Sequence, residues 1–421
     1  MNSLRKHWLT ATAGAVAVWS SPALAQDTTA PPIDSVDAAI PSRNYDYLDL
    51  TANLGYSSNP FLQAGNSRSS SLGRVSARGV HAWGGQRSSS SVSAFVEGST
   101  YLNDYGLKTI FSVTGDTQFQ ASERVSVFGT ASVTGDLGGQ LSNRFLYVPP
   151  VAVVPNPNQP PPPINVDDPD LFSFTGRQYR IYGQGGASFL TSQGSTLTVS
   201  GGAQRTFYTD DLLDDFTTVL GNGMYSRTLS ERTTIGVGVG VNHTNYSNSS
   251  ASSTTINPTV NVRTLLSENW DASASVGVSF SKVDQELGGS DSSTNISLDA
   301  SLCRSLEFDR FCGRVARYAQ SSSRAALFTT TSVGVDWYKK LDADSTIQLS
   351  AAVVRYVSET QALQDFRTHH FRLAASYSRR IKTRLSAGAD VGFRSLRQSG
   401  PDPNADIGGS VFLRYRLGDL G

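Results

Sequence analysis

The residues of this chain with the clearest capacity for chemistry are arginines that recur at alternate positions. Near the C-terminal end, Arg372, Arg384, Arg394, Arg414 and Arg416 share one parity within three neighbouring stretches. A guanidinium group keeps its charge at every physiological pH and can bind a carboxylate or phosphate through two parallel hydrogen bonds. Of the 35 basic residues only six are lysines. The pattern predicts a surface that attracts anions.

One acidic residue, Asp390, has the same parity as these arginines, although the formal net charge of the whole chain is +0. In one register of the strands concerned, Arg372 and Asp390 would be cross-strand partners, and the arginines would then only pair with acids and join neighbouring strands. A positive surface and a set of structural ion pairs therefore both stay open.

Residues suited to catalysis or metal binding are few. Adjacent strand residues point to opposite faces, so His369 and His370 are poorly placed to chelate one metal ion together. Serine is so abundant that its occurrence beside a histidine and an acid carries no information about a hydrolase. We expect no enzymatic activity, catalytic residue, metal site or cofactor, and we expect these two histidines to be solvated at a loop edge.

Cys303 and Cys312 are the only cysteines. A two-residue turn at Glu307-Phe308 would place them directly opposite each other on one face of a hairpin, at a separation that a disulfide can bridge. In an oxidising compartment they would form a structural disulfide that closes a short loop. A different register of the turn would leave two free thiols.

These residues are positioned by an alternation of apolar and small or polar residues that runs from about 48 to 417. Successive side chains of a strand point to opposite faces, so this period predicts strands with one apolar and one wet face. Eighteen strands are expected, with 16 as the alternative. Their ranges are 48–59, 69–84, 87–104, 107–122, 124–140, 172–192, 195–210, 214–230, 232–248, 252–268, 270–286, 293–308, 309–323, 327–343, 345–359, 368–382, 383–397 and 406–418.

The connections alternate between tight turns and mostly longer loops rich in Asn, Pro, Asp and Ser. Short periplasmic turns and longer external loops are typical of outer-membrane barrels. One loop is exceptional, because 141–171 is rich in proline, which cannot donate ladder hydrogen bonds. It is either a disordered outer loop or a stiff arm over the mouth. The tight turns are expected at Gly85-Gln86, Ser122-Glu123, Ser192-Gln193-Gly194, Ser230-Glu231, Ser267-Glu268-Asn269, Glu307-Phe308, Asp342-Ala343-Asp344 and Arg380-Ile381-Lys382.

The first 25 residues have the features of an export signal. Arg5 and Lys6 precede an apolar stretch, and Ala23-Leu24-Ala25 resembles a cleavage site. Residues 26–44 are polar and aperiodic, which predicts a flexible periplasmic segment before a barrel over 45–421. No later segment approaches the roughly 18 apolar residues of a spanning helix.

A soluble sandwich would also alternate, but the export signal and the even strand count favour a transmembrane antiparallel up-and-down β-barrel. The mean hydropathy of −0.24 does not oppose this fold, because a barrel needs apolar residues only at alternate positions. A barrel of this size encloses an aqueous lumen. Parity predicts that the lumen is lined, as candidate transport residues, by Arg74, Arg78, Arg180, Arg263, Arg314, Arg372, Arg384, Asp390, Arg394, Arg414 and Arg416.

The first strand and the loop after it, from Leu48 to Leu62, read LDLTANLGYSSNPFL. Gly55-Tyr56, a short polar stretch and Asn59-Pro60-Phe61 resemble the opening of an outer-membrane β-barrel family found alongside exopolysaccharide biosynthesis and export genes. Length and architecture resemble that family over 45–421. The resemblance implies a role in the export or surface organisation of an exopolysaccharide at the outer membrane of a Gram-negative bacterium.

The expected partners are outer-membrane lipids and lipopolysaccharide, an anionic polysaccharide and periplasmic export components. The neutral chain offers no case for nucleic-acid binding. A general diffusion porin and a structural or enzymatic outer-membrane barrel remain the alternative classes.

Overall fold

A computed structural model describes residues 44–62, 68–85, 87–102, 106–137, 177–210, 213–247, 249–285, 289–323, 326–359, 367–398 and 404–418. These ranges contain eighteen strands, as expected, and no helix. No helix of the described residues is long and apolar enough to cross a membrane. The strands are β1 (Tyr45–Ser57), β2 (Ser70–Gly85), β3 (Ser88–Tyr101), β4 (Gly106–Ser122), β5 (Val125–Leu137), β6 (Arg177–Ser192), β7 (Ser195–Tyr208), β8 (Phe216–Ser230), β9 (Thr233–Tyr246), β10 (Ser252–Ser267), β11 (Trp270–Asp284), β12 (Ser290–Ser305), β13 (Asp309–Ser321), β14 (Leu327–Lys340), β15 (Ser345–Ser358), β16 (Arg367–Lys382), β17 (Leu385–Arg397) and β18 (Asn404–Gly418).

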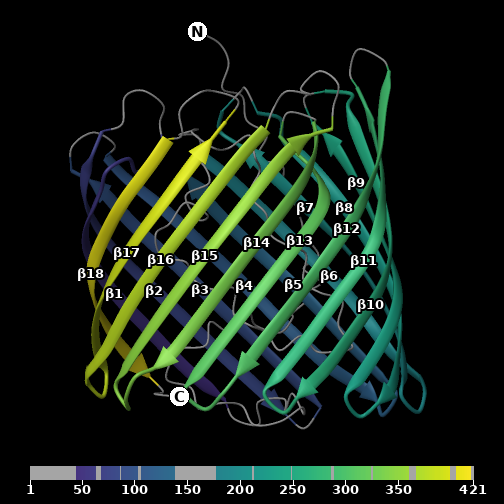
Figure 1. The fold of residues 1–421 in the computed structure, drawn as a ribbon, viewed down its shortest axis with the longest axis horizontal. Coiled ribbons are helices and arrows are strands. Elements are labelled where there is room, and N and C mark those ends of the chain that lie inside the picture. The colour runs from purple at the N-terminus through teal and green to yellow at the C-terminus, as the bar shows by residue number, and fades with distance from the viewer. Residues whose placement is uncertain are drawn as a thin grey trace, which may run out of the picture.

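Each strand pairs antiparallel with the next strand in the chain, and β1 also pairs with β18, so the sheet closes on itself. Leu48 of β1 has Gly79 of β2 on one side and Leu417 of β18 on the other. Figure 1 shows the tilted strands running around the wall. The antiparallel up-and-down barrel predicted from the alternation is confirmed.

The outer face of the barrel is apolar and the inner face is polar. Leu54 and Val75, which are 71% and 67% exposed, face outward, whereas Asn53 and Arg74 on the same strands face inward and are buried. Alternation produces this division because a strand turns successive side chains to opposite faces. An apolar surface that is continuous around a closed sheet is stable against lipid rather than water.

The two ends of the barrel differ. At one end, here the short-turn end, strands are joined by tight connections such as Gln193-Gly194 and Glu231-Arg232. Both Tyr45 and Gly418 lie at this end, because an even number of strands returns the chain to its starting side. The opposite end, which carries the longer connections, is the mouth of the barrel. Three tryptophans lie near the short-turn end at outward positions, where an interfacial girdle would be: Trp83, Trp270 and Trp337.

The wall is incompletely paired at one seam near the mouth. Strands β12 and β13 pair only from Leu298 to Ser305 of β12, although β12 reaches outward to Ser290 and β13 to Ser321. The end of β13 instead turns into the barrel. The Ser321 hydroxyl lies 2.6 Å from the hydroxyl of Ser253 on the inner face of β10, and the following residue is fully buried. The end of the β13–β14 hairpin therefore packs inside the mouth.

Three expected segments lie outside the described residues. These are the export signal over 1–25, all but the last residue of the flexible segment over 26–44, and the proline-rich loop over 141–171. Their assignments remain predictions from sequence.

Candidate functional site

The inner wall of the barrel is charged on one side. The five adjacent strands β16, β17, β18, β1 and β2 present seven arginines and three carboxylates inward. One of the seven, Arg380, is exposed at the short-turn end and pairs with Asp344 of the turn before β15, so six line the wall itself. The inner faces of β7, β8 and β9, by contrast, carry no charged residue. The lumen therefore has an arginine-rich wall and an uncharged wall of threonine, serine, glycine and asparagine. The charged residues of the arginine wall are Arg74, Arg78, Arg372, Arg394, Arg414, Arg416, Asp49, Asp390 and Asp406.

Three of the arginines predicted for the lumen also face inward but lie on other parts of the wall. They are Arg180 on β6, Arg263 on β10 and Arg314 on β13. Arg314 forms an ion pair with Asp299 of the neighbouring strand β12, with Nη2 2.6 Å from Oδ2. These three residues are therefore not part of the arginine wall.

The placement of Arg384 on the inner wall is wrong. The pairing of β16 with β17 shifts between Arg380 and Lys382, so β16 continues to Lys382 and the turn falls at Thr383-Arg384. Arg384 is exposed in this turn at the short-turn end, and its carbonyl oxygen accepts a hydrogen bond from the Arg416 amide. The irregularity moves the turn beyond Arg380-Ile381-Lys382, where it was expected.

The register that would pair Arg372 with Asp390 is also wrong. Arg372 lies opposite Arg394, and Asp390 lies opposite Ser376. The Asp390 carboxylate accepts a hydrogen bond from the Ser410 hydroxyl at 3.4 Å. The arginines whose charges act on Asp390 are Arg414 of β18 and Arg74 of β2. One buried carboxylate therefore lies among arginines from different strands.

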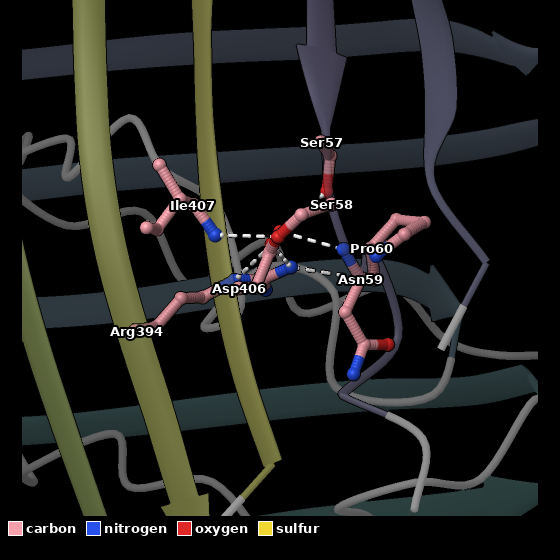
Figure 2. Close-up of polar contacts among 7 residues, drawn as sticks. All are labelled: Ser57, Ser58, Asn59, Pro60, Arg394, Asp406 and Ile407. Carbon is pink, nitrogen blue, oxygen red and sulfur yellow. Dashed lines mark hydrogen bonds and ion pairs between the residues drawn. The ribbon is translucent and has the colours of Figure 1, made fainter. Parts of the chain in front are cut away.

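A buried ion pair between β17 and β18 lies on the arginine wall near the mouth. The Nε and Nη2 atoms of Arg394 donate to Oδ2 of Asp406 at 3.0 and 2.6 Å. The two side chains are only 3% and 0% exposed. Burial of an ion pair is tolerated where further hydrogen bonds satisfy its remaining atoms. Here those atoms are satisfied by the segment that follows β1, as Figure 2 shows.

The segment after β1 is held against this ion pair. Oδ1 of Asp406 accepts hydrogen bonds from the amide of Asn59 at 2.8 Å and from the hydroxyl of Ser58 at 3.1 Å. The Ser57 hydroxyl also donates to this carboxylate, and Nη2 of Arg394 donates to the carbonyl oxygen of Pro60 at 2.8 Å. We call residues 58–62 the inner loop. Its backbone is thus bound through side chains more than 330 positions away in the chain.

Apolar side chains complete the attachment of the inner loop. Phe61 packs with Leu72 and Tyr101, with its ring centroid 5.3 Å from that of Tyr101. Leu62 has a positive φ of 52°, a conformation that non-glycine residues adopt only where the surroundings enforce it. It belongs to a buried group that joins the inner loop to the β13–β14 hairpin end. We call this group the mouth cluster: Leu62, Ala326, Phe328, Tyr356 and Leu396.

The second strong ion pair of the arginine wall lies near the short-turn end. Arg416 donates to both carboxylate oxygens of Asp49, at 2.7 and 2.6 Å. Its guanidinium carbon also lies 4.3 Å from the ring centroid of Tyr47, a cation–π contact. In the cross-strand register Asp49 lies between Arg416 and Arg78. Sequence reasoning missed Asp49 and Asp406 as partners, although Asp406 shares its parity with Arg414 and Arg416.

His369 and His370 point to opposite faces, as parity predicts. His369 is exposed on the outer face, but His370 is 6% exposed on the inner face, so the expectation that both are solvated is wrong for His370. It is buried because it lies opposite Leu396, a member of the mouth cluster. Cys303 and Cys312 lie opposite each other in the register and are joined by a disulfide.

A closed eighteen-stranded antiparallel barrel with an apolar outer face and a polar, charged interior is a transmembrane β-barrel of the outer-membrane type. The protein belongs to the outer membrane of a Gram-negative bacterium.

No protein-family model and no curated protein matches the chain. Solved structures of outer-membrane proteins resemble the barrel. OccK2 (OpdF) of Pseudomonas aeruginosa, solved in complex with glucuronate, is 10% identical over 89% of this chain and 98% of its own, with a TM-score of 0.46. OccAB3 of Acinetobacter baumannii is 10% identical over 89% and 99%, with a TM-score of 0.43. The FrpB iron transporter of Neisseria meningitidis is 10% identical over 85% and 62%, with a TM-score of 0.45.

Proposed function

We propose that this outer-membrane channel takes part in the export or surface organisation of an anionic exopolysaccharide, whose chain moves along the arginine wall of the lumen. The observation that supports the proposal is the excess of arginine on one wall, where six guanidinium groups lie among only three carboxylates. The resemblance of Gly55-Tyr56 and Asn59-Pro60-Phe61 to barrels of exopolysaccharide loci points to the same class of polymer.

The charges of the wall differ in how strongly they are already engaged. Arg394 and Arg416 are bound by two hydrogen bonds each to Asp406 and Asp49. Arg74 and Arg414 both act on Asp390. A polymer carrying carboxylates or pyruvyl groups would then meet a positive potential that salt screens over about 8 Å. Weak, repeated contacts of this kind suit a chain that must slide through.

The uncharged wall suits the sugar hydroxyls of such a polymer. The inner faces of β7 and β9 present alternating hydroxyl, amide and glycine positions, for example Thr198, Ser200 and Asn242. These groups can exchange hydrogen bonds with hydroxyls and with water at little net change in free energy, because a neutral hydrogen bond replaces another. A polysaccharide would therefore meet electrostatic attraction on one side and readily exchanged hydrogen bonds on the other.

A general diffusion porin is the second candidate. It is favoured by the uncharged wall and by the polar lumen, which would pass small hydrophilic solutes of either sign. The two candidates differ in whether their activity depends on a polymer. A porin would conduct ions at the same level whether or not the cell makes a polysaccharide.

The experiment that tests the proposal replaces Arg74, Arg372 and Arg414 together with Gln. These positions leave the Arg394–Asp406 and Arg416–Asp49 pairs intact. The expected result is lower polysaccharide at the cell surface and a weaker preference for anions in planar bilayers, because the wall loses half of its guanidinium groups. The matched control replaces Arg180 and Arg263, inner-face arginines outside the wall. If the triple variant assembles normally and both readouts stay at the wild-type level, the transport proposal fails.

A further inference from the structure

A row of four basic side chains and one threonine crosses the outer face of five adjacent strands close to the mouth. Successive cross-strand partners in this row are Arg317 of β13, Thr331 of β14, Arg355 of β15, His369 of β16 and Arg397 of β17. All five have the outward parity of their strands, and Arg355, His369 and Arg397 are exposed. We call these five residues the basic row.

The basic row borders the apolar band of the outer face. Two residues closer to the short-turn end, the same register places Val315, Val333, Val353 and Phe371 side by side on β13 to β16. A step of two residues along a strand is about 6.8 Å. The basic groups therefore lie at the depth where apolar side chains give way to polar ones, which is the depth of lipid headgroups around an outer-membrane barrel.

The row has no acidic member. Arg317 donates a hydrogen bond to the hydroxyl of Thr331 at 3.3 Å, and the charges of Arg355 and Arg397 both act on His369 between them. Strand spacing puts Arg355 and Arg397 about 10 Å apart. Arg355 and Arg397 flank His369 from two different strands, and like charges at this separation repel each other when no acid lies between them. An anion that contacts several strands at once would remove this repulsion.

We propose that the basic row binds the phosphate groups of lipopolysaccharide in the outer leaflet. Guanidinium groups bind phosphate through two parallel hydrogen bonds, and the three arginines of the row all lie on the mouth side of the outer apolar residues of their strands. The occupant is a lipid because the apolar row directly below can contact acyl chains while Arg355 and Arg397 contact the phosphates. A small soluble anion would gain nothing from this border, since the side chains below offer it no polar contact.

The test compares the purified barrel in detergent micelles with lipopolysaccharide, with the same lipopolysaccharide after enzymatic removal of its phosphates, and with inorganic phosphate. The variant replaces Arg317, Arg355 and Arg397 with Gln. It should bind lipopolysaccharide at least about tenfold more weakly than the wild type, the equivalent of losing one charge-assisted hydrogen bond. Dephosphorylated lipopolysaccharide should bind both proteins equally weakly. The matched control replaces Arg227 and Arg379, which face outward near the short-turn end, and should bind like the wild type.

Three results would overturn the proposal. Equal binding of lipopolysaccharide by wild type and row variant is the first, and retention of affinity after dephosphorylation is the second. The third is that inorganic phosphate alone stabilises the wild-type barrel as much as lipopolysaccharide does, because the site would then take a free anion.

A separate measurement guards against misfolding of the variant. In micelles without phosphate, the variant should unfold at the same temperature as the wild type or at a higher one, because repulsion within the row is gone. Unfolding at a lower temperature would show that these arginines serve the fold, and it would also contradict the proposal.

Discussion

Arg394 and Asp406 form the ion pair that is most completely removed from solvent among the described charges of the arginine wall. Their oxygens and nitrogens also bind Ser57, Asn59 and Pro60, so the pair serves as an anchor for backbone as well as a link between two strands. A buried charge that loses its partner is costly, whereas an exposed pair contributes little. Arg394 is therefore a poor candidate for contact with a transported anion.

The first prediction concerns Asp406→Asn. We expect the free energy of unfolding to fall by about 3–5 kcal/mol, because Arg394 keeps its charge while its partner becomes neutral. Urea unfolding of the assembled barrel in micelles measures this change. The control is Asp299→Asn, which breaks the exposed pair with Arg314 and should cost about 0–1 kcal/mol.

A second variant tests whether the unpaired charge of Arg394 causes this loss. Adding Arg394→Met to Asp406→Asn should recover part of the stability that Asp406→Asn alone loses, since no unpaired charge remains and the amide oxygen at position 406 still accepts a hydrogen bond from the Asn59 amide. An Asp406→Asn protein as stable as the wild type would contradict the buried geometry of the pair.

Two elements narrow the mouth, and they are held by different chemistry. The inner loop is attached by hydrogen bonds to β17 and β18 and by Phe61 and Leu62. The end of the β13–β14 hairpin is attached by the contact of Ser321 with Ser253 and by the hydrogen bond from the Asp214 amide to the Ser323 carbonyl oxygen. The mouth cluster joins the two elements, so a change in one should affect the other.

The second prediction tests the inner loop as a constriction. Replacing Phe61 and Leu62 with Ser removes both apolar contacts, and each buried large side chain contributes about 2–4 kcal/mol. The loop should then leave the mouth for part of the time, and single-channel conductance in planar bilayers should rise. Leu102→Ser is the control, because Leu102 is a 69% exposed residue in another connection at the same end. Unchanged conductance in the double variant would show that the loop does not limit the pore.

At the scale of the whole molecule, the closed sheet explains why the chain needs no continuous apolar segment. Every strand has a hydrogen-bonded neighbour on both sides, and most of the large apolar residues that are exposed lie on the lipid side. The two ends differ in their connections, and we propose on this ground that the short-turn end faces the periplasm and the mouth faces the cell surface.

The third prediction tests this orientation. Single cysteines are placed at Gln159 and at Gln193, in a background in which Cys303 and Cys312 are both replaced by Ser. A membrane-impermeant thiol reagent should label Gln159→Cys in intact cells and should label Gln193→Cys only after the outer membrane is opened. Gln193 lies in the exposed turn between β6 and β7 at the short-turn end, whereas Gln159 lies in the proline-rich segment outside the described residues. Equal labelling of the two sites in intact cells would invert or abolish the proposed topology.

The sequence by itself determined the local properties of the barrel. The number of strands, the face that residues within the strands take and the opposition of Cys303 to Cys312 could be read from it, because alternation and a short hairpin turn depend only on residues near one another in the chain. The inward placement of Arg394, Arg414 and Arg416 follows for the same reason.

Only the tertiary structure decided which inward residues meet. One irregularity between Arg380 and Lys382 moved Arg384 out of the wall, and the register paired Asp390 with Ser376 instead of Arg372. The contacts of Asp406 with Asn59 join positions 347 residues apart, and they exist because closure brings β1 beside β18. Alternation is the same for every offset between two strands and for every path of a loop, so it predicts the face of a residue but cannot identify its partner.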